Sequence, residues 1–200
     1  MALTPDTPAG ATELDADEAA GLIPKSLTTR AQLDEFESAN IAEAMAWSAT
    51  KRRDVLAEGF LRDLHRRMFG RVWRWAGLFR ASGKNIGIAA HDVPAAMRDL
   101  VEDAKAQIAA GHTPVDEVAA RFHHRLTRIH PFANGNGRHA RLATDLLLEQ
   151  LGERHFSWGA ADLKHAVEAR EQYIAALRAA DGGNHRPLLD FLRQRSAAAG

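Results

Sequence analysis

The sequence has 200 residues, of which 46% are hydrophobic, and its 26 basic and 26 acidic side chains give a formal charge of zero at pH 7. This length and composition favour one compact domain, and the balanced charge argues against a general binder of nucleic acids or anionic membranes. The sequence has no cysteine, which excludes disulfides and thiolate metal sites. It has no signal-like N-terminus and no bilayer-spanning apolar run, so we expect a cytoplasmic protein without a membrane partner.

The first half of the chain reads as a tail followed by two helices. Residues 1–20 are rich in Ala, Thr, Pro and Asp, and we expect a flexible N-terminal tail over 1–28. Apolar residues at helical spacing then predict an amphipathic helix over 29–49 and a second helix from Asp54 to Gly70. Trp73 and Trp75 follow, and we expect their indoles to cover a small core rather than to stack on bases.

A short hairpin is predicted between residues 78 and 90. The runs 78–80 and 86–88 are compatible with strands, and they flank a turn signal at 82–85. A two-stranded ribbon is marginal on its own and must pack against the rest of the protein. Its free edge could pair with a peptide backbone.

The second half is predicted to be helical apart from one glycine-rich loop. A helix runs from Pro94 to Gly111, and another begins with Thr113 as cap and Pro114 at its first position and ends next to His130. Further helices are predicted up to Gly152, over 162–180 and from Pro187. We therefore expect a single domain over 29–195, with residues 196–200 as a C-terminal tail.

The loop between the two central helices has the composition of a phosphate cradle. Gly135 and Gly137 allow a tight turn whose N–H groups can face an anion, and the helix that follows adds the positive end of its dipole. Arg138 and Arg141 lie three residues apart, so both can hold phosphate oxygens from one side of the first helical turn. More than one phosphate fits such a site.

His130 lies at the start of the same loop. Because Pro131 disfavours a helical conformation at the preceding residue, we expect His130 to be extended and to lie beside the cradle. Imidazole accepts a proton near neutral pH, so the loop could activate a hydroxyl that attacks a bound phosphate.

The surroundings of the loop are basic. Residues 118–144 contain no Asp or Glu, and three arginines share a face of the preceding helix, Arg121, Arg125 and Arg128. That face is either a solvated surface or an extension of the anion site.

The loop resembles the signature of the Fic family, in the order His130-Pro131-Phe132-x-x-Gly135-Asn136-Gly137-Arg138-x-x-Arg141. Gly77 and Arg80, spaced Gly-x-x-Arg ahead of the predicted hairpin, resemble the approach to the flap of that family. The resemblance covers residues 30–195, and the chain's size and N-terminal segment are similar to the subgroup called mobile mystery protein B. The resemblance to the Fic family implies a mainly α-helical bundle with a small β-hairpin flap beside the active-site loop.

The resemblance also implies an activity, the transfer of AMP from ATP to a Ser, Thr or Tyr hydroxyl of a target protein. By this analogy His130 is the general base and Phe132 anchors the loop. The resemblance assigns the remaining site residues as an anion hole (the amides of Gly135, Asn136 and Gly137 and the Asn136 side chain), outer-phosphate ligands (Arg138 and Arg141) and a flap that docks the target backbone (Lys84, Asn85, Ile86, Gly87 and Ile88).

Two further features follow from the same resemblance. The family usually has Asp or Glu where this chain has Asn134, and that carboxylate holds Mg²⁺, so Asn134 should hold Mg²⁺ or Mn²⁺ more weakly. Many members are inhibited by a helix whose glutamate pairs with the second arginine, here Arg141. We expect the 29–49 helix to play this part with Glu37, although the usual inhibitory motif is not cleanly present; an antitoxin-like partner is the alternative.

The same residues are compatible with functions other than AMP transfer. Relatives with altered loops transfer the terminal phosphate as kinases, but they lack the intact Gly-Asn-Gly-Arg sequence. A non-catalytic nucleotide- or nucleic-acid-binding helical module would use the arginine-rich helix that precedes the loop, together with Trp73 and Trp75. A metal-dependent phosphohydrolase could be argued from ten histidines and the pair His91-Asp92, but no acid lies near the loop to complete a metal site.

Overall fold

The computed structural model describes residues 14–159 and 166–194, and the prediction of a mainly α-helical fold is confirmed. The elements are α1 (Ala16–Ala20), α2 (Arg30–Ala49), α3 (Glu58–Phe69), the 3₁₀ turn η1 (Ala90–Asp92), α4 (Val93–Ala110), α5 (Val115–Ile129), α6 (Asn136–Gln150), α7 (Ala166–Asp181) and α8 (Arg186–Leu192).

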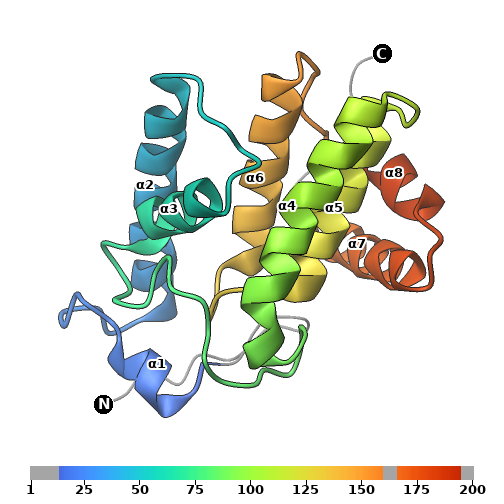
Figure 1. Ribbon diagram of the computed structural model, residues 1–200. Helices are drawn as coiled ribbons and strands as arrows, with labels where there is room; N and C mark the ends of the chain where they lie inside the picture. The colour runs from blue at the N-terminus through green and yellow to red at the C-terminus, as the bar shows by residue number, and fades with distance from the viewer. Residues whose placement is uncertain (1–13, 160–165, 195–200) are drawn as a thin grey trace, which may run out of the picture.

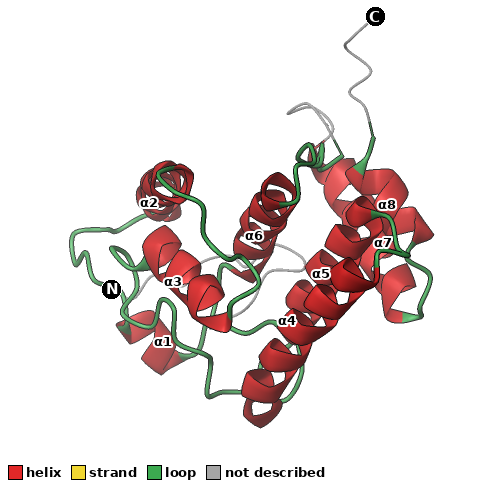
Figure 2. Cartoon of the chain, turned by 45° about the horizontal axis from the view of Figure 1, so that its top comes forward, coloured by secondary structure: helices red, strands yellow, loops and turns green. Residues whose placement is uncertain are grey.

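Helices α4, α5 and α6 run side by side through the middle of the molecule (Figure 1). Helices α2 and α3 pack together on one side of them, and α7 and α8 pack together on the other. The view in Figure 2 shows the same arrangement, with loops joining the helices at both ends. Because only residues 130–135 separate α5 from α6, these two helices are antiparallel neighbours, and the loop between them lies at one end of the bundle.

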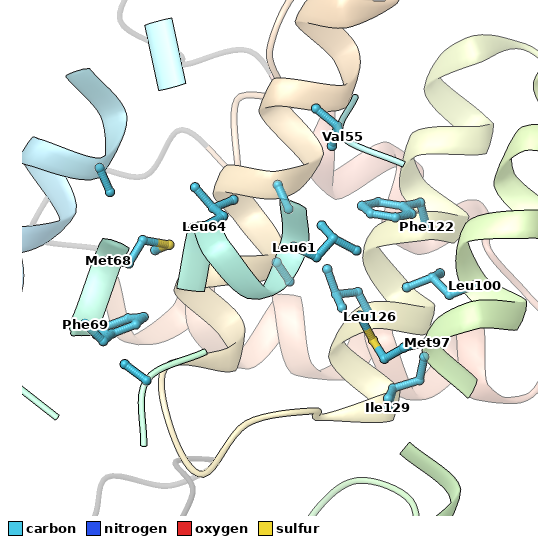
Figure 3. Close-up of a cluster of buried hydrophobic side chains, with 14 of the residues drawn as sticks. Val55, Leu61, Leu64, Met68, Phe69, Met97, Leu100, Phe122, Leu126 and Ile129 are labelled. Carbon is cyan, nitrogen blue, oxygen red and sulfur yellow. The ribbon is translucent and has the colours of Figure 1, made fainter. Parts of the chain in front are cut away.

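The core beneath this loop is built chiefly from α3, α4 and α5 (Figure 3). Leu61 of α3 lies among Phe122 and Leu126 of α5, and all three are almost fully buried. Removing one such side chain costs on the order of 3 kcal/mol. The α5–α6 loop is therefore held on a rigid base.

Several predicted helix ends are confirmed, and two predicted starts are wrong: α3 begins at Glu58 and not at Asp54, and α5 does not begin at Thr113. Thr29 caps α2, its hydroxyl accepting from the amide of Gln32, and Gly111 ends α4 with the left-handed φ of 67°. The cap predicted at Thr113 does not form. Helix α5 begins at Val115, and Pro114, at φ −53° and ψ 139°, is the cap residue whose carbonyl receives the first helical hydrogen bonds.

The predicted β-hairpin does not form. Residues 78–89 contain no strand, and the structure's described part has one isolated bridge, between Leu22 and Trp73. Gly87, with φ 100°, interrupts the second expected strand. The side chain of Arg80 bonds the carbonyls of Ser82 and Ile88, which holds the segment in an irregular conformation that needs no strand pairing.

The expected tail over 1–28 is partly folded. Asp15 and Glu18 form a capping box at the start of α1, and Leu22 pairs with Trp73. Local polar composition predicted a tail, but the pairing of Leu22 is made with a residue more than fifty positions away. Residues 1–13 and 196–200 lie outside the described residues. Among the helices described, none has the length and apolar character needed to cross a membrane.

Candidate active site

His130 ends α5 in a left-handed conformation, φ 55° and ψ 59°, and not in the extended one that was predicted. Pro131 does exclude the right-handed helical region, but the left-handed region satisfies the same restriction. It also lets the amide of His130 donate to the Leu126 carbonyl at 3.2 Å. The imidazole is therefore placed by the geometry of the helix end.

The imidazole of His130 is suited to accept a proton. Its Nδ1 lies 3.1 Å from the carbonyl oxygen of Thr127, so Nδ1 carries the proton and Nε2 carries the lone pair. His130 is buried, and this burial lowers its pKa to about 4. At neutral pH it is an uncharged base.

The loop after His130 is fastened by Asn136 and Phe132. Phe132 is fully buried, as expected of a loop anchor. The Asn136 side chain accepts from the amide of Phe132 at 2.9 Å and donates to its carbonyl at 2.8 Å. The Asn136 side chain thus shapes the loop through both of its polar atoms, and its part in an anion hole, which would use the second N–H of Nδ2, stays a prediction.

His65 of α3 is a supporting residue that sequence reasoning missed. Its Nδ1 accepts from the amide of Gly77 at 3.0 Å, so Nε2 carries the proton and donates to the carbonyl of Asn134, also at 3.0 Å. Its ring stacks on Phe132 with 3.7 Å between centroids. Burial holds the pKa of His65 well below its usual value, which keeps the ring neutral. No local pattern marked this helix histidine, since its partners are distant in sequence.

Gly135 and Gly137 act differently at the start of α6. Gly135 precedes the helix with φ 77°, and a Cβ there would lie 2.6 Å from the Phe69 ring. Gly137 lies in the first turn, is exposed, and has open space where a Cβ would be. The first turn of α6 leaves amides without helical acceptors. Gly135 shapes the turn, and Gly137 leaves those amides accessible.

The two arginines of α6 turn toward opposite partners. Arg138 pairs with Glu37 of α2 at 2.7 Å and lies 4.8 Å from the ring centre of Phe69. The other oxygen of Glu37 accepts from Nε1 of Trp73 at 2.6 Å. Glu37 was expected to pair with Arg141, the second arginine; it instead pairs with the first.

Arg141 lies against aromatic rings of the C-terminal part. Its guanidinium is 5.0 Å from the ring centre of Tyr173 and 5.7 Å from that of Trp158. Tyr173 in turn lies 2.7 Å from Nε2 of buried His123, and burial raises the pKa of Tyr173 to about 12. Tyr173 is therefore a neutral platform for this arginine.

The segment predicted as the flap, residues 84–88, lies beside His130. A Cβ on Gly87 would be 2.6 Å from Cβ of His130, so the two residues are in contact. Lys84 is almost buried and forms an ion pair with Glu18 of α1. Arg80 bonds both this segment and the carbonyl of His130, the latter at 2.6 Å.

The three arginines on one face of α5 pair with nearby acidic side chains. This pairing supports the interpretation of the face as a solvated surface and not as an extension of the anion site. The pairs are Arg121–Glu117 at 2.6 Å, Arg125–Asp103, and Arg128–Asp181 at 3.9 Å.

A cavity of about 480 Å³ lies between residues 87–88, α5 and α7. Its lining includes His124, Thr127 and Asp181, and the carbonyl of Thr127 is the one that orients His130. This volume falls in the usual range for a small-molecule site.

The residues near the loop offer a metal few ligands. Oδ1 of Asn134 accepts from the amide of Gly135 at 2.5 Å, and it is a neutral oxygen. Throughout the ranges 14–159 and 166–194, no cluster of three or more His or acidic side chains could hold a metal. These residues fit Mg²⁺ only as an ion held mainly by phosphates and water, with one oxygen from Asn134.

A buried neutral histidine lies one short loop away from a helix N-terminus that carries two arginines, an arrangement whose chemistry suits a polyphosphate and a proton transfer beside it. Comparison with known proteins identifies the class of protein more closely. Residues 55–148 match the model of the Fic/DOC family. The part of the chain that holds the site therefore belongs to the Fic/DOC family.

Curated relatives include the protein adenylyltransferase fic-1 of Caenorhabditis elegans, 27% identical over 155 residues, which are 75% of this chain and 29% of the relative. The protein adenylyltransferase Fic of Drosophila melanogaster is 29% identical over 150 residues, 72% of this chain and 29% of the relative. The chain thus spans less than a third of the length of these relatives.

Solved structures show the same fold. The N-terminal Fic domain of a Bartonella effector protein from Bartonella sp. AR 15-3 superposes with a TM-score of 0.68 at 15% identity, covering 90% of this chain and 92% of that one. A Bartonella quintana Fic domain with bound ADP gives 0.66 at 17% identity, covering 84% and 86%.

Proposed function

We propose that this protein transfers AMP from ATP to a hydroxyl side chain of a target protein. The observation that carries the proposal is the position of His130, a buried imidazole that is neutral at pH 7, one loop away from the N-terminus of α6. A base and a polyphosphate cradle on one rigid loop suit phosphoryl-type substitution. The curated relatives are named protein adenylyltransferases, which supports the same reaction here.

In the proposed reaction the target hydroxyl attacks the α-phosphorus of ATP. The new bond joins the target oxygen to phosphorus, the bond to the β-bridging oxygen breaks, and pyrophosphate leaves. His130 accepts the hydroxyl proton at Nε2. Amides at the start of α6 stabilise the phosphate charge, and Arg138 and Arg141 hold the outer phosphates.

The backbone of residues 84–88 would present the target next to His130.

A divalent ion would neutralise part of the phosphate charge. Asn134 would supply one neutral oxygen to it, so the ion would depend mainly on ATP for binding, and the affinity for Mg²⁺ would be weaker than with a carboxylate.

The test uses ATP labelled on either the α- or the γ-phosphate, incubated with purified protein and cell lysate in Mg²⁺ and, separately, Mn²⁺. We expect label from the α position on a protein band, and none from the γ position. His130→Ala should abolish labelling. His112→Ala, a change at an exposed histidine between α4 and α5, should leave labelling intact.

Two outcomes would overturn the proposal. Transfer of γ-label would assign a phosphotransferase. Absence of both labels in the wild type and in Glu37→Ala, which removes the carboxylate from Arg138, would leave a binding module rather than an enzyme.

A further inference from the structure

The guanidinium of Arg80 is buried, with 5% of the residue exposed, and it donates to four backbone carbonyls. Nε donates to His130 at 2.6 Å, and Nη1 donates to Ser82 at 3.0 Å. Nη2 donates to Ile88 and, at 3.3 Å, to Ile129. The guanidinium is thus bonded to main chain on every side.

These carbonyls belong to two separate parts of the site. Ser82 and Ile88 lie at the two ends of residues 82–88, here called the docking segment because residues 84–88 would present the target. Ile129 and His130 form the end of α5. The amide of Arg80 adds a fifth tie, because it donates to the carbonyl of Pro131 at 2.9 Å. One side chain therefore joins the docking segment to the loop that carries the base.

The bonds to the end of α5 support an unfavourable backbone. A non-glycine residue in the left-handed region costs on the order of 1 kcal/mol, and His130 is in that region. Helix-end carbonyls also lack helical donors. Charge-assisted bonds from Arg80 satisfy these carbonyls where the backbone must turn.

The docking segment also touches His130 directly. Beyond its approach to Cβ of His130, a Cβ on Gly87 would be 3.0 Å from Nη2 of Arg80, and Gly87 has φ 100°. A shift of residues 82–88 thus cannot occur without changing the surroundings of both Arg80 and His130.

We propose that Arg80 is a positioning residue that fixes the docking segment and the conformation of His130 as one unit. The role rests on the proposed transfer reaction, in which the segment places the target and His130 takes its proton. Target placement and base placement are then set by the same guanidinium. A displacement of about 1 Å in such geometry can cost about a hundredfold in rate.

Lysine cannot replace this arrangement. An ammonium group keeps the positive charge but is a compact point donor, whereas the planar fork of Arg80 reaches carbonyls on both segments. Arg80→Lys therefore keeps the positive charge and removes the planar fork, so it tests the geometry of the contacts by itself. Arg98→Lys is the matched control, since Arg98 is exposed on α4.

The first measurement is hydrogen–deuterium exchange of wild type, Arg80→Lys and Arg98→Lys. In Arg80→Lys we expect faster exchange in two peptides together, one over residues 82–88 and one over 127–135, with α4 and α8 unchanged. Faster exchange in only one of the two peptides, or a uniform increase across the bundle, would overturn the proposal.

The second measurement compares ATP binding with the initial rate of α-label transfer. For Arg80→Lys we expect the rate to fall about 10- to 100-fold. The dissociation constant for ATP should stay within about threefold of wild type, because Arg80 does not lie in the α6 cradle. A parallel loss of ATP binding and rate would indicate a merely structural role and overturn it.

The two proposals fail in different ways. If wild-type protein transfers no label, the proposed function fails, while the exchange experiment still tests whether Arg80 joins the two segments. If wild type transfers label and Arg80→Lys transfers it equally fast, the positioning role fails alone.

Discussion

Gly135 and Gly137 lie two residues apart in the same loop, yet the structure requires glycine at only one of them. Gly135→Ala would place a methyl group 2.6 Å from the Phe69 ring at a φ of 77°. Gly137→Ala would place its methyl group in open space within the first turn of α6. The first change disturbs the fold, and the second disturbs access to the amides.

We therefore expect opposite results for this matched pair. Gly135→Ala should lower the free energy of unfolding by about 1–3 kcal/mol, through strain and overpacking. Gly137→Ala should preserve or raise stability by roughly 0.5–1 kcal/mol while weakening ATP binding several-fold. Thermal unfolding and calorimetric titration with ATP measure both effects. Equal ATP affinity in Gly137→Ala and wild type would contradict the assigned cradle.

Asn134→Asp tests the proposed metal ligand. A carboxylate at this position gives a divalent ion a charged oxygen and also suits the positive end of α6. We expect the Mg²⁺ concentration for half-maximal transfer to fall by about tenfold or more, with stability unchanged or slightly higher. A Mg²⁺ titration of α-label transfer provides the measurement. An unchanged Mg²⁺ dependence would show that Asn134 does not face the ion.

Some individual roles could be read from the sequence and others could not. The resemblance of the local loop motif to the Fic signature implied that Phe132 anchors the loop, and its burial agrees with this. The base role of His130 and the nucleotide role of the arginines remain predictions. The hydrogen bonds from the side chains of Asn136, His65 and Arg80 to the backbone of the loop were missed, because only folding brings these atoms together.

Helix α2 reaches the site through one carboxylate. Glu37 is almost buried, and it holds Arg138 with one oxygen while it accepts from Trp73 with the other. We propose that this ion pair restrains Arg138 from turning toward phosphates and so inhibits the site, through a different arginine from the one expected.

Glu37→Ala should have opposite effects on binding and stability. Release of Arg138 should tighten ATP binding about three- to tenfold, on the order of 1 kcal/mol. Loss of the acceptor for Trp73 should lower the free energy of unfolding by about 1–3 kcal/mol. Titration with ATP and thermal unfolding separate the two.

The control is Glu35→Ala, at an exposed position of the same helix. If both variants bind ATP with wild-type affinity, α2 does not restrain the nucleotide site.

The long helices were predictable because an apolar stripe recurs along each of them, as in α5 and α4. The docking segment was mispredicted as a hairpin because strand propensity ignores a competing side chain. Arg80 satisfies the carbonyls at its two ends and leaves the segment irregular. The fold of residues 14–28 was missed for a similar reason, since their partners Trp73 and Lys84 are remote.

The molecule as a whole should be sensitive to mild acid. Burial lowers the pKa of His123 to about 3 and those of His130 and His139 to about 4, against an ordinary value of 6.5. Between about pH 6.5 and pH 4 the unfolded chain binds more protons than the folded one. The free energy of unfolding therefore falls as the pH decreases across this range. Asp145, whose pKa is raised by burial, opposes this trend.

We expect the free energy of unfolding to be several kcal/mol lower at pH 4.5 than at pH 7, since each unit of pKa shift corresponds to about 1.4 kcal/mol. Urea unfolding at pH 7, 5.5 and 4.5 measures the difference. His139→Gln should reduce the pH dependence, although it also loses the bond to Leu61. A free energy of unfolding that does not change across this range would show that these histidines are not buried as neutral groups.

The buried side chains form two separate clusters, one around α2, α3 and α4 and one around α7 and α8, and α5 and α6 contribute to both. Arg138 faces the first through Glu37, and Arg141 faces the second through Tyr173. Helix α7 packs chiefly on α8, and α8 on α5, so this pair can open as a unit at lower cost than the centre. Of the two α6 arginines, only Arg141 would lose its support in such an opening. Proteolysis of α7 under native conditions should therefore slow when ATP is added, because a nucleotide held by Arg141 binds only the closed form.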